Sequence, residues 1–139
     1  MREPAPFGKV MGAFLVASIA ASLLAGAILW LLFAREAPLS AFTDTPAILF
    51  YALVLGFPFA FGHALVLGLP AYLWLERRYR LHWWNAMASG AVVGVVPMLI
   101  WIGPASAWEG IALLLIVGAS GAGGGLVFRL ALYDLMRKP

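Results

Sequence analysis

Four long apolar blocks dominate this 139-residue sequence. None has a charged residue in its interior, and Arg129 lies near the end of the fourth. Each block reaches the roughly 20 residues that an α-helix needs to cross a hydrocarbon layer of about 30 Å. Apolar and polar residues do not alternate within the blocks, so a transmembrane β-barrel is not expected. We therefore predict an all-α fold, an antiparallel four-helix transmembrane bundle forming one domain over residues 1–139. The expected helices cover residues 10–34, 47–75, 83–103 and 109–132.

Composition supports a membrane protein over a soluble one. The residues are 64% hydrophobic and only 11% charged, and the mean hydropathy is +0.97. Soluble domains carry about 25% charged residues. The chain has no cysteine, which excludes disulfides and thiolate metal sites. The first block is longer than the roughly 7–15 apolar residues of a signal peptide, so we expect a retained transmembrane helix.

The basic residues predict the orientation of the bundle, because Lys and Arg concentrate on the cytoplasmic side. With four spans, eight of the nine basic residues fall on one side, and only Arg35 falls on the other. Those eight are Arg2, Lys9, Arg77, Arg78, Arg80, Arg129, Arg137 and Lys138. Both termini are therefore expected in the cytoplasm. The loop arginines Arg77, Arg78 and Arg80 are also candidates for binding anionic lipid head groups.

The tryptophans give the same layout, because Trp favours the membrane–water interface. Three are expected near the outer interface and three near the inner one, with none at mid-membrane. The outer set is Trp30, Trp101 and Trp108, and the inner set is Trp74, Trp83 and Trp84.

Small residues recur at helical spacing in every block, which is typical of close helix–helix contact in lipid. The predicted packing residues are Ser18, Ser22, Gly26, Gly90, Gly94, Gly118, Gly121 and Gly125. One interpretation is packing within the bundle. The other is a dimerisation or partner-docking face on the fourth helix, because its glycine run over residues 118–125 is denser than a single contact requires.

The second block is interrupted by prolines and glycines. Pro58 and Pro70 each remove a backbone hydrogen-bond donor and leave a carbonyl without its helical partner. Such carbonyls are available to a ligand when they line a cavity. The segment also holds His63, the one ionisable side chain near mid-span, and intramembrane ionisable residues are functional candidates. We therefore name His63, Pro58, Pro70 and Gly62 as a candidate ligand or ion path.

A structural alternative exists for each of these features. The prolines are compatible with a kinked, tilted helix, and His63 with a neutral imidazole that joins two helices. Its expected partners are a freed carbonyl or one of the hydroxyls of Ser18, Ser22, Ser89 and Ser120. No second histidine or carboxylate shares its depth, so no metal site is expected.

The stretch from Gly62 to Gly94 contains Gly-His-Ala-Leu-Val-Leu-Gly-Leu-Pro-Ala-Tyr, the arginine loop, and Trp-Trp-Asn-Ala. With Gly-Gly-Leu-Val-Phe128 in the last block, it resembles small uncharacterised four-span proteins of proteobacterial inner membranes. The likeness covers about three-quarters of the chain. It implies a fold and a compartment, the bacterial inner membrane, but no activity.

Two functional hypotheses follow. The first is a non-enzymatic protein acting through lateral helix contacts, as an accessory subunit or an immunity-type protein. The alternative is a small oligomeric transporter or channel, with His63 and the broken second helix lining its path. No catalytic triad and no cofactor are expected. The expected partners are membrane lipids and either another membrane protein or further copies of this chain, and nucleic acid is not expected.

Overall fold

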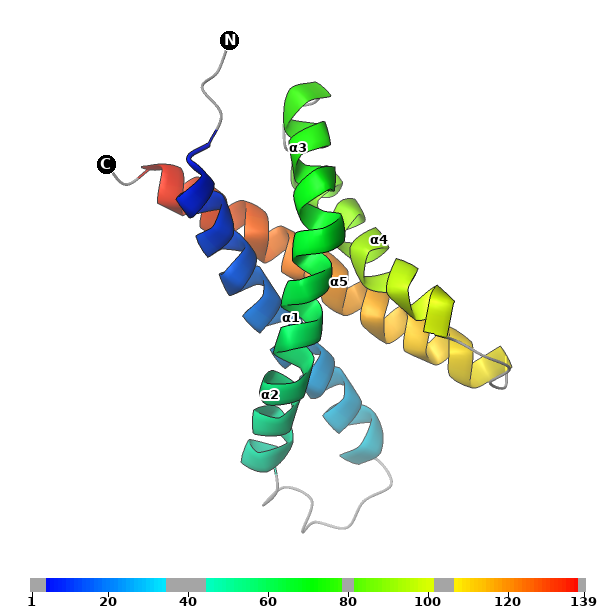
Figure 1. Cartoon of the computed structure of the whole chain (residues 1–139). Helices are drawn as coiled ribbons and strands as arrows, with labels where there is room; N and C mark the ends of the chain where they lie inside the picture. The colour runs from blue at the N-terminus through cyan, green and yellow to red at the C-terminus, as the bar shows by residue number, and fades with distance from the viewer. Residues whose placement is uncertain (1–4, 35–44, 79–81, 102–106, 138–139) are drawn as a thin grey trace.

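The computed structural model describes residues 5–34, 45–78, 82–101 and 107–137. Its elements are α1 (Phe7–Ala34), α2 (Thr45–His63), the π-helical turn η2 (Ala64–Gly68), α3 (Leu69–Arg78), α4 (Trp83–Trp101) and α5 (Ala107–Arg137) (Figure 1). Because α2, η2 and α3 follow one another without a break, they form a single long helix. The described residues thus make four helices, and the predicted all-α fold is confirmed at this level.

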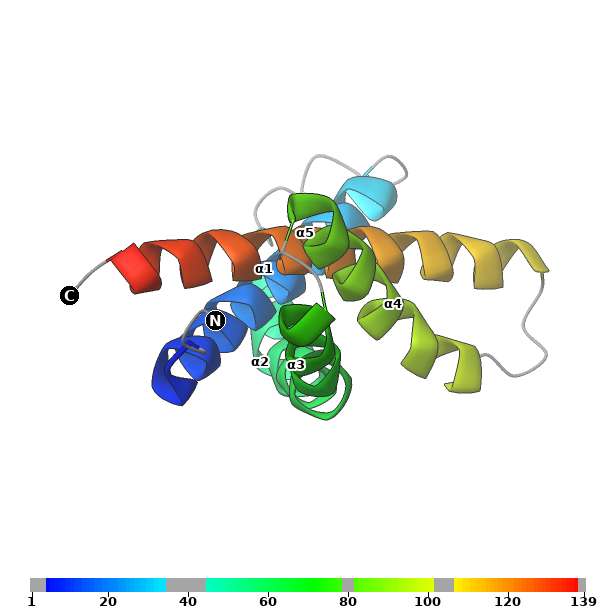
Figure 2. The same cartoon turned by 90° about the horizontal axis from the view of Figure 1, so that it is seen from above.

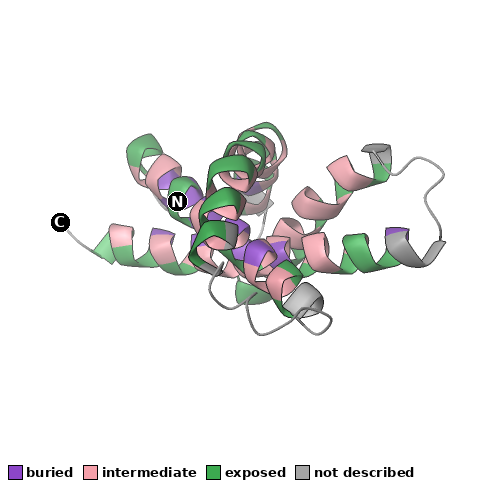
Figure 3. Ribbon diagram, turned by 90° about the horizontal axis from the view of Figure 1, so that it is seen from below, coloured by how far each residue is buried: buried purple, intermediate pink, exposed green. Residues whose placement is uncertain are grey.

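Three of the four helices are long and apolar enough to cross a membrane. These stretches are Phe7–Leu31, Leu49–Glu76 and Gly110–Arg137, whereas α4 contributes the shorter apolar stretch Trp83–Leu99. Large apolar side chains are exposed along all four helices, and most of the buried residues lie where helices meet (Figure 3). Apolar side chains on the outside are expected of helices surrounded by lipid, because lipid chains form no hydrogen bonds with a polar protein surface.

Helix α5 is central to the packing. It contacts α4 along its N-terminal half and α1 along its C-terminal half (Figure 2). Helix α1 also packs against α2. The second long helix makes few contacts with α4, so it is attached to the rest mainly through α1. The helices therefore splay apart on the side where α2 and α4 face each other.

The crossing of α4 and α5 brings two backbones into direct contact. A methyl group on Gly90 would collide with the carbonyl oxygen of Gly121 and lie 3.0 Å from the Cα of Gly125. A methyl group on Gly125 would collide with the carbonyl oxygen of Ala86. Glycine is therefore required on both helices, because any larger residue would drive them apart.

The glycine run of α5 also contacts α1, on a different face of the helix from the one that contacts α4. A methyl group on Gly124 would lie 3.0 Å from the Cβ of Ala21, and one on Gly123 would lie 2.6 Å from the Cδ2 of Leu24. Both neighbours belong to α1. The density of this run therefore has a cause inside the molecule, since α5 lies between two helices and needs small residues toward each.

The remaining predicted packing residues also lie at helix contacts. In α1, Ser18 and Ser22 are buried, and a methyl group on Gly26 would lie 2.5 Å from the Cβ of Ala52 in α2. In the α4–α5 pair, a methyl on Gly94 would lie 2.7 Å from the carbonyl oxygen of Val117, and one on Gly118 would lie 3.2 Å from Val95.

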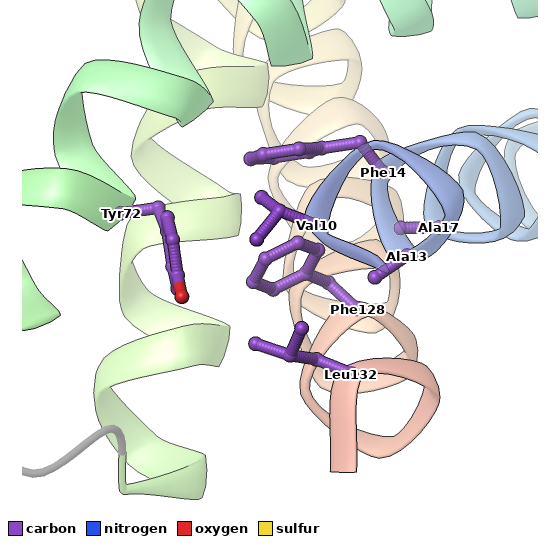
Figure 4. Packing of buried hydrophobic residues seen from close by; sticks show 7 residues of the cluster. All are labelled: Val10, Ala13, Phe14, Ala17, Tyr72, Phe128 and Leu132. Atoms are coloured by element: carbon purple, nitrogen blue, oxygen red, sulfur yellow. The ribbon is translucent and has the colours of Figure 1, made fainter. Parts of the chain in front are cut away.

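A small apolar core forms where α1, α3 and α5 meet (Figure 4). It consists of Val10, Ala13, Phe14, Ala17, Tyr72, Phe128 and Leu132. This aromatic cluster joins the C-terminal end of the second long helix to α1 and α5.

Part of the predicted orientation rests on residues outside those described. These are Arg2, Arg35, Arg80 and Lys138, together with the side chains of Arg77, Arg78, Trp101 and Trp108. The candidate head-group site over Arg77, Arg78 and Arg80, and the predicted cytoplasmic location of both termini, stay predictions. Figure 1 places the start of α1, the end of α5 and the end of α3 toward the same end of the molecule.

We expect Gly90→Ala and Gly121→Ala each to lower the free energy of unfolding by about 1–3 kcal/mol, because the added methyl meets backbone that cannot move aside. Titration of the purified protein from mild detergent into dodecyl sulfate measures this. Gly62→Ala is the matched control, since nothing lies within 4 Å of its added methyl. Equal effects at Gly62 and Gly90 would contradict the described α4–α5 contact.

Candidate functional site

An open cavity of about 720 Å³ lies among the four helices. All four helices contribute to its wall, and most of the lining residues are Gly, Ala or Ser. A neighbouring hollow of about 400 Å³ between α3 and α4 shares Leu75, Ser89 and Val93 with it. The two hollows therefore adjoin each other between the second long helix and α4. Its volume falls in the range of about 300–1,000 Å³ that small-molecule sites occupy.

One face of the second long helix forms a wall of this cavity. Its small lining residues recur at intervals of four, a spacing that places them on one side of a helix. They are Ala52, Gly56, Ala60, Ala64 and Gly68. Because these side chains are so short, the helices leave space between them wherever the backbones diverge.

His63 is the polar group in the middle of this wall. Its Nδ1 lies 2.6 Å from the carbonyl oxygen of Phe59, one helical turn earlier. A carbonyl oxygen only accepts hydrogen bonds, so Nδ1 carries the proton and donates it. In the neutral ring, Nε2 is then a hydrogen-bond acceptor. Within the described residues, this imidazole makes no other hydrogen bond, and His63 is among the residues lining the cavity.

The serines predicted as partners of His63 bond elsewhere. Each hydroxyl donates to a carbonyl of its own helix: Ser18 to Phe14, Ser22 to Ser18, Ser89 to Ala86 and Ser120 to Ile116, over 2.7–3.0 Å. All four serines line the cavity. Their protons are used and their oxygens keep unused lone pairs, so they offer acceptors to the cavity rather than donors.

The π-helical turn η2 lies directly between His63 and Pro70. The backbone N–H of Leu69 bonds to the carbonyl of Ala64, five residues earlier. A proline ring clashes with the carbonyl four residues before it, and a wider turn relieves that clash. The turn is therefore a local response to Pro70. Such single π-turns are frequent at functional sites.

The predicted path residues do not all reach the cavity. His63 does, but Pro58, Gly62 and Pro70 are exposed and are not among the lining residues. Pro58 and Gly62 lie off the face that carries Gly56, Ala60 and Ala64. The structure has a π-helical turn before Pro70, whereas Pro58 lies within α2 without interrupting it. Sequence reasoning also did not resolve the two faces of this helix. Tyr72, which continues the spacing of four after Gly68, was missed although that spacing was its signal.

The charge of the wall restricts what it can bind. Among the described lining residues there is no Asp, Glu, Lys or Arg. Nor do the described residues bring together three or more His, Cys, Asp or Glu side chains that could hold a metal ion. The wall is thus apolar with a few hydrogen-bonding groups, a composition suited to an uncharged ligand.

Comparison of the chain with models of known protein families, with curated protein sequences and with solved structures gives no match.

Because the chain lacks cysteine, single cysteines probe the cavity directly. We expect Ala60→Cys, on the cavity wall, to react with N-ethylmaleimide on the order of tenfold faster than Val66→Cys, on the lipid-facing side of the same helix. The reactive thiolate is suppressed in apolar surroundings. Val66 is 71% exposed and does not line the cavity. Reaction rates in liposomes measure the difference, and equal rates would show that no solvent-filled cavity reaches residue 60.

Proposed function

We propose that this chain is a multi-pass protein of the bacterial inner membrane that binds an uncharged small molecule in its central cavity. This is the binding step expected of a small transporter or channel, with His63 on the wall of the path. The observation that carries the proposal is the cavity of about 720 Å³ with the His63 Nε2 as an available acceptor. The function is non-enzymatic in this proposal, with both termini in the cytoplasm.

Four membrane crossings form part of the proposal. Helix α4 has 19 residues, which rise by about 28 Å at 1.5 Å per residue and nearly match the hydrocarbon thickness. The paired rings of Trp83 and Trp84 lie at its start, with centroids 4.0 Å apart. Tryptophans at a helix end favour the interface, which supports α4 as a fourth span.

The second candidate is a protein that acts through lateral contacts, as an accessory subunit or immunity-type protein. It is favoured by the second long helix, whose surface the other helices leave largely exposed. No residue in the most apolar window of Leu49–Glu76 is buried, against 28% for Phe7–Leu31 and 17% for Gly110–Arg137. Its exposed side chains include Phe50, Leu55 and Val66. A partner helix would cover this surface from outside, without using the cavity.

A cavity-filling substitution tests the first proposal without knowledge of the ligand. We expect an uncharged molecule to copurify with the wild-type protein and to be lost from Ala60→Phe, because the ring occupies the cavity. Solvent extraction of the purified protein, followed by mass spectrometry, measures the bound species. Val66→Phe is the matched control, since it adds the same ring on the lipid-facing side.

Identical extracts from wild type, Ala60→Phe and Val66→Phe would argue against a ligand in the cavity. Loss of a copurifying protein from Val66→Phe alone would instead support the lateral-contact candidate.

Replacement of His63 separates a binding role from a structural one. We expect His63→Asn to keep the stability of the wild type, because the amide N–H takes over the bond to the Phe59 carbonyl. It should retain about fivefold less copurifying molecule, because the acceptor at Nε2 is gone and one hydrogen bond contributes about 1 kcal/mol. Unchanged retention in both His63→Asn and His63→Leu would favour the lateral-contact candidate.

A further inference from the structure

The hollow of about 400 Å³ between α3 and α4 opens to the outside of the molecule. One wall is a face of the second long helix over residues 67–75, and the other is a face of α4 over residues 85–96. Trp74 and Val92, on opposite walls, are 54% and 58% exposed. In a membrane, the mouth of this hollow therefore faces lipid.

The packing of α4 explains why the hollow is open. Helix α4 packs closely against α5, whereas it makes few contacts with the second long helix and diverges from it (Figure 1). The two walls carry Ala71 and Ala88, whose methyl groups are too short to fill the space between the diverging helices. The hollow thus results from the same contacts that hold α4 to α5.

The inner side of the hollow adjoins the central cavity. Leu75, Ser89 and Val93 line both spaces. A molecule in the hollow therefore reaches the cavity by passing these three side chains, of which Ser89 is polar. The hollow has lipid at its mouth and the proposed binding site at its inner side.

Asn85 places an amide in this apolar hollow. Its side chain is partly buried, and it makes no hydrogen bond within the part of the chain that the structure describes. Its amide atoms remain accessible, since neither is among the buried atoms that lack a partner. An amide group both donates and accepts hydrogen bonds. Ser89, one helical turn later, donates its proton to the carbonyl of Ala86 and keeps lone pairs to offer.

The groups beyond Asn85 indicate the chemistry of the ligand. The lining serines and His63 use their protons within their own helices and offer acceptors to the cavity, so a matching ligand carries a donor such as a hydroxyl. No Asp, Glu, Lys or Arg is among the described residues that line either space, which suits an uncharged molecule. The remaining walls are apolar and suit a hydrocarbon chain.

The length of the hollow matches one lipid leaflet. Val96 follows Asn85 by eleven residues, roughly 16 Å along a helix axis, and this is close to half of a hydrocarbon layer of about 30 Å. Asn85 directly follows Trp83 and Trp84 at the start of α4, and tryptophans favour the membrane interface. A chain lying along α4 would thus have its polar end beside Asn85.

We propose that the α3–α4 hollow is the entrance through which a single-chain, uncharged alcohol passes from the lipid layer to the central cavity, and that the Asn85 amide binds its hydroxyl at the mouth. This inference rests on the proposed ligand-binding function. It adds the route that the ligand takes and the chemical class of the ligand.

The test uses two photoreactive probes with the full chain in lipid nanodiscs. The first is a medium-chain primary alcohol that carries a diazirine and a terminal alkyne, and the second is the same chain without the hydroxyl. Labelling that an excess of the diazirine-free alcohol suppresses is specific. Specific labelling of α4 along the hollow reports the entrance. Specific labelling of Ser18 and Ser120, which line the cavity but not the hollow, reports arrival in the cavity.

Substitution of Asn85 tests the contact at the mouth. We expect Asn85→Leu to lower labelling of the hollow by the alcohol about fivefold, to the level of the hydrocarbon probe, because one hydrogen bond contributes about 1 kcal/mol. The control is Tyr133→Phe, which removes a hydrogen-bonding group from a side chain that is 65% exposed and lines neither space. It should leave the labelling of the hollow unchanged.

Filling the hollow tests the route. We expect Ala71→Trp to lose specific labelling of Ser18 and Ser120, because the indole occupies the entrance. Ala88→Trp, from the opposite wall, should have the same effect, and dodecyl sulfate titration checks that both variants are folded. Val66→Trp is the matched control, since it adds the same ring on the second long helix away from both spaces.

Unchanged labelling of the cavity in both Ala71→Trp and Ala88→Trp overturns the entrance. The proposed cavity function stands in that case if Ala60→Phe still abolishes the cavity labelling. Labelling of the hollow that Asn85→Leu does not change overturns the contact at the mouth. Specific labelling of the hollow without any in the cavity also overturns the entrance. No specific labelling at either place, with no copurifying molecule, contradicts both proposals.

Discussion

The direct contact of the α4 and α5 backbones at Gly90, Gly121 and Gly125 is the constraint on which the rest of this structure depends. In lipid, burying an apolar side chain against another helix gains little, so association relies on close packing and polar contacts. Glycine allows that approach because nothing projects from its backbone. Once α5 is fixed against α4, its neighbouring glycines at 123 and 124 position α1 on the next face. The second long helix is then attached mainly through α1.

The same small residues also produce the cavity. At a crossing they allow two helices to touch, but away from it they are too short to fill the space between diverging backbones. Ala60 and Ala64 illustrate this, since both face the interior and neither is fully buried. A chain with large residues at these positions would close the gap. The space is therefore a consequence of how tightly α5 is held by its two partners.

The polar side chains around this cavity offer more hydrogen-bond acceptors than donors. The four lining serines and His63 donate to carbonyls of their own helices, so what remains toward the cavity is mostly acceptor. The lateral-contact hypothesis gives no role to this arrangement, whereas ligand binding does. Ligand binding in the cavity is therefore the function that we propose, and the α5 glycine run, which packing within the molecule explains, gives no separate support to lateral contacts.

Hydropathy alone predicted four helices close to their observed places, because a long uncharged apolar run has few other stable forms and a helix satisfies its own backbone. The two prolines had different outcomes, since Pro70 follows the π-helical turn of the second long helix whereas Pro58 lies inside α2. What hydropathy did not decide is which neighbour each small residue touches. Gly and Ala fit against almost any partner, so Gly121 and Gly124 carry no signal that one faces α4 and the other α1. The tertiary structure decided those pairings. It thereby decided that His63 and Tyr72 line one cavity, while Pro58, Gly62 and Pro70 face away from it.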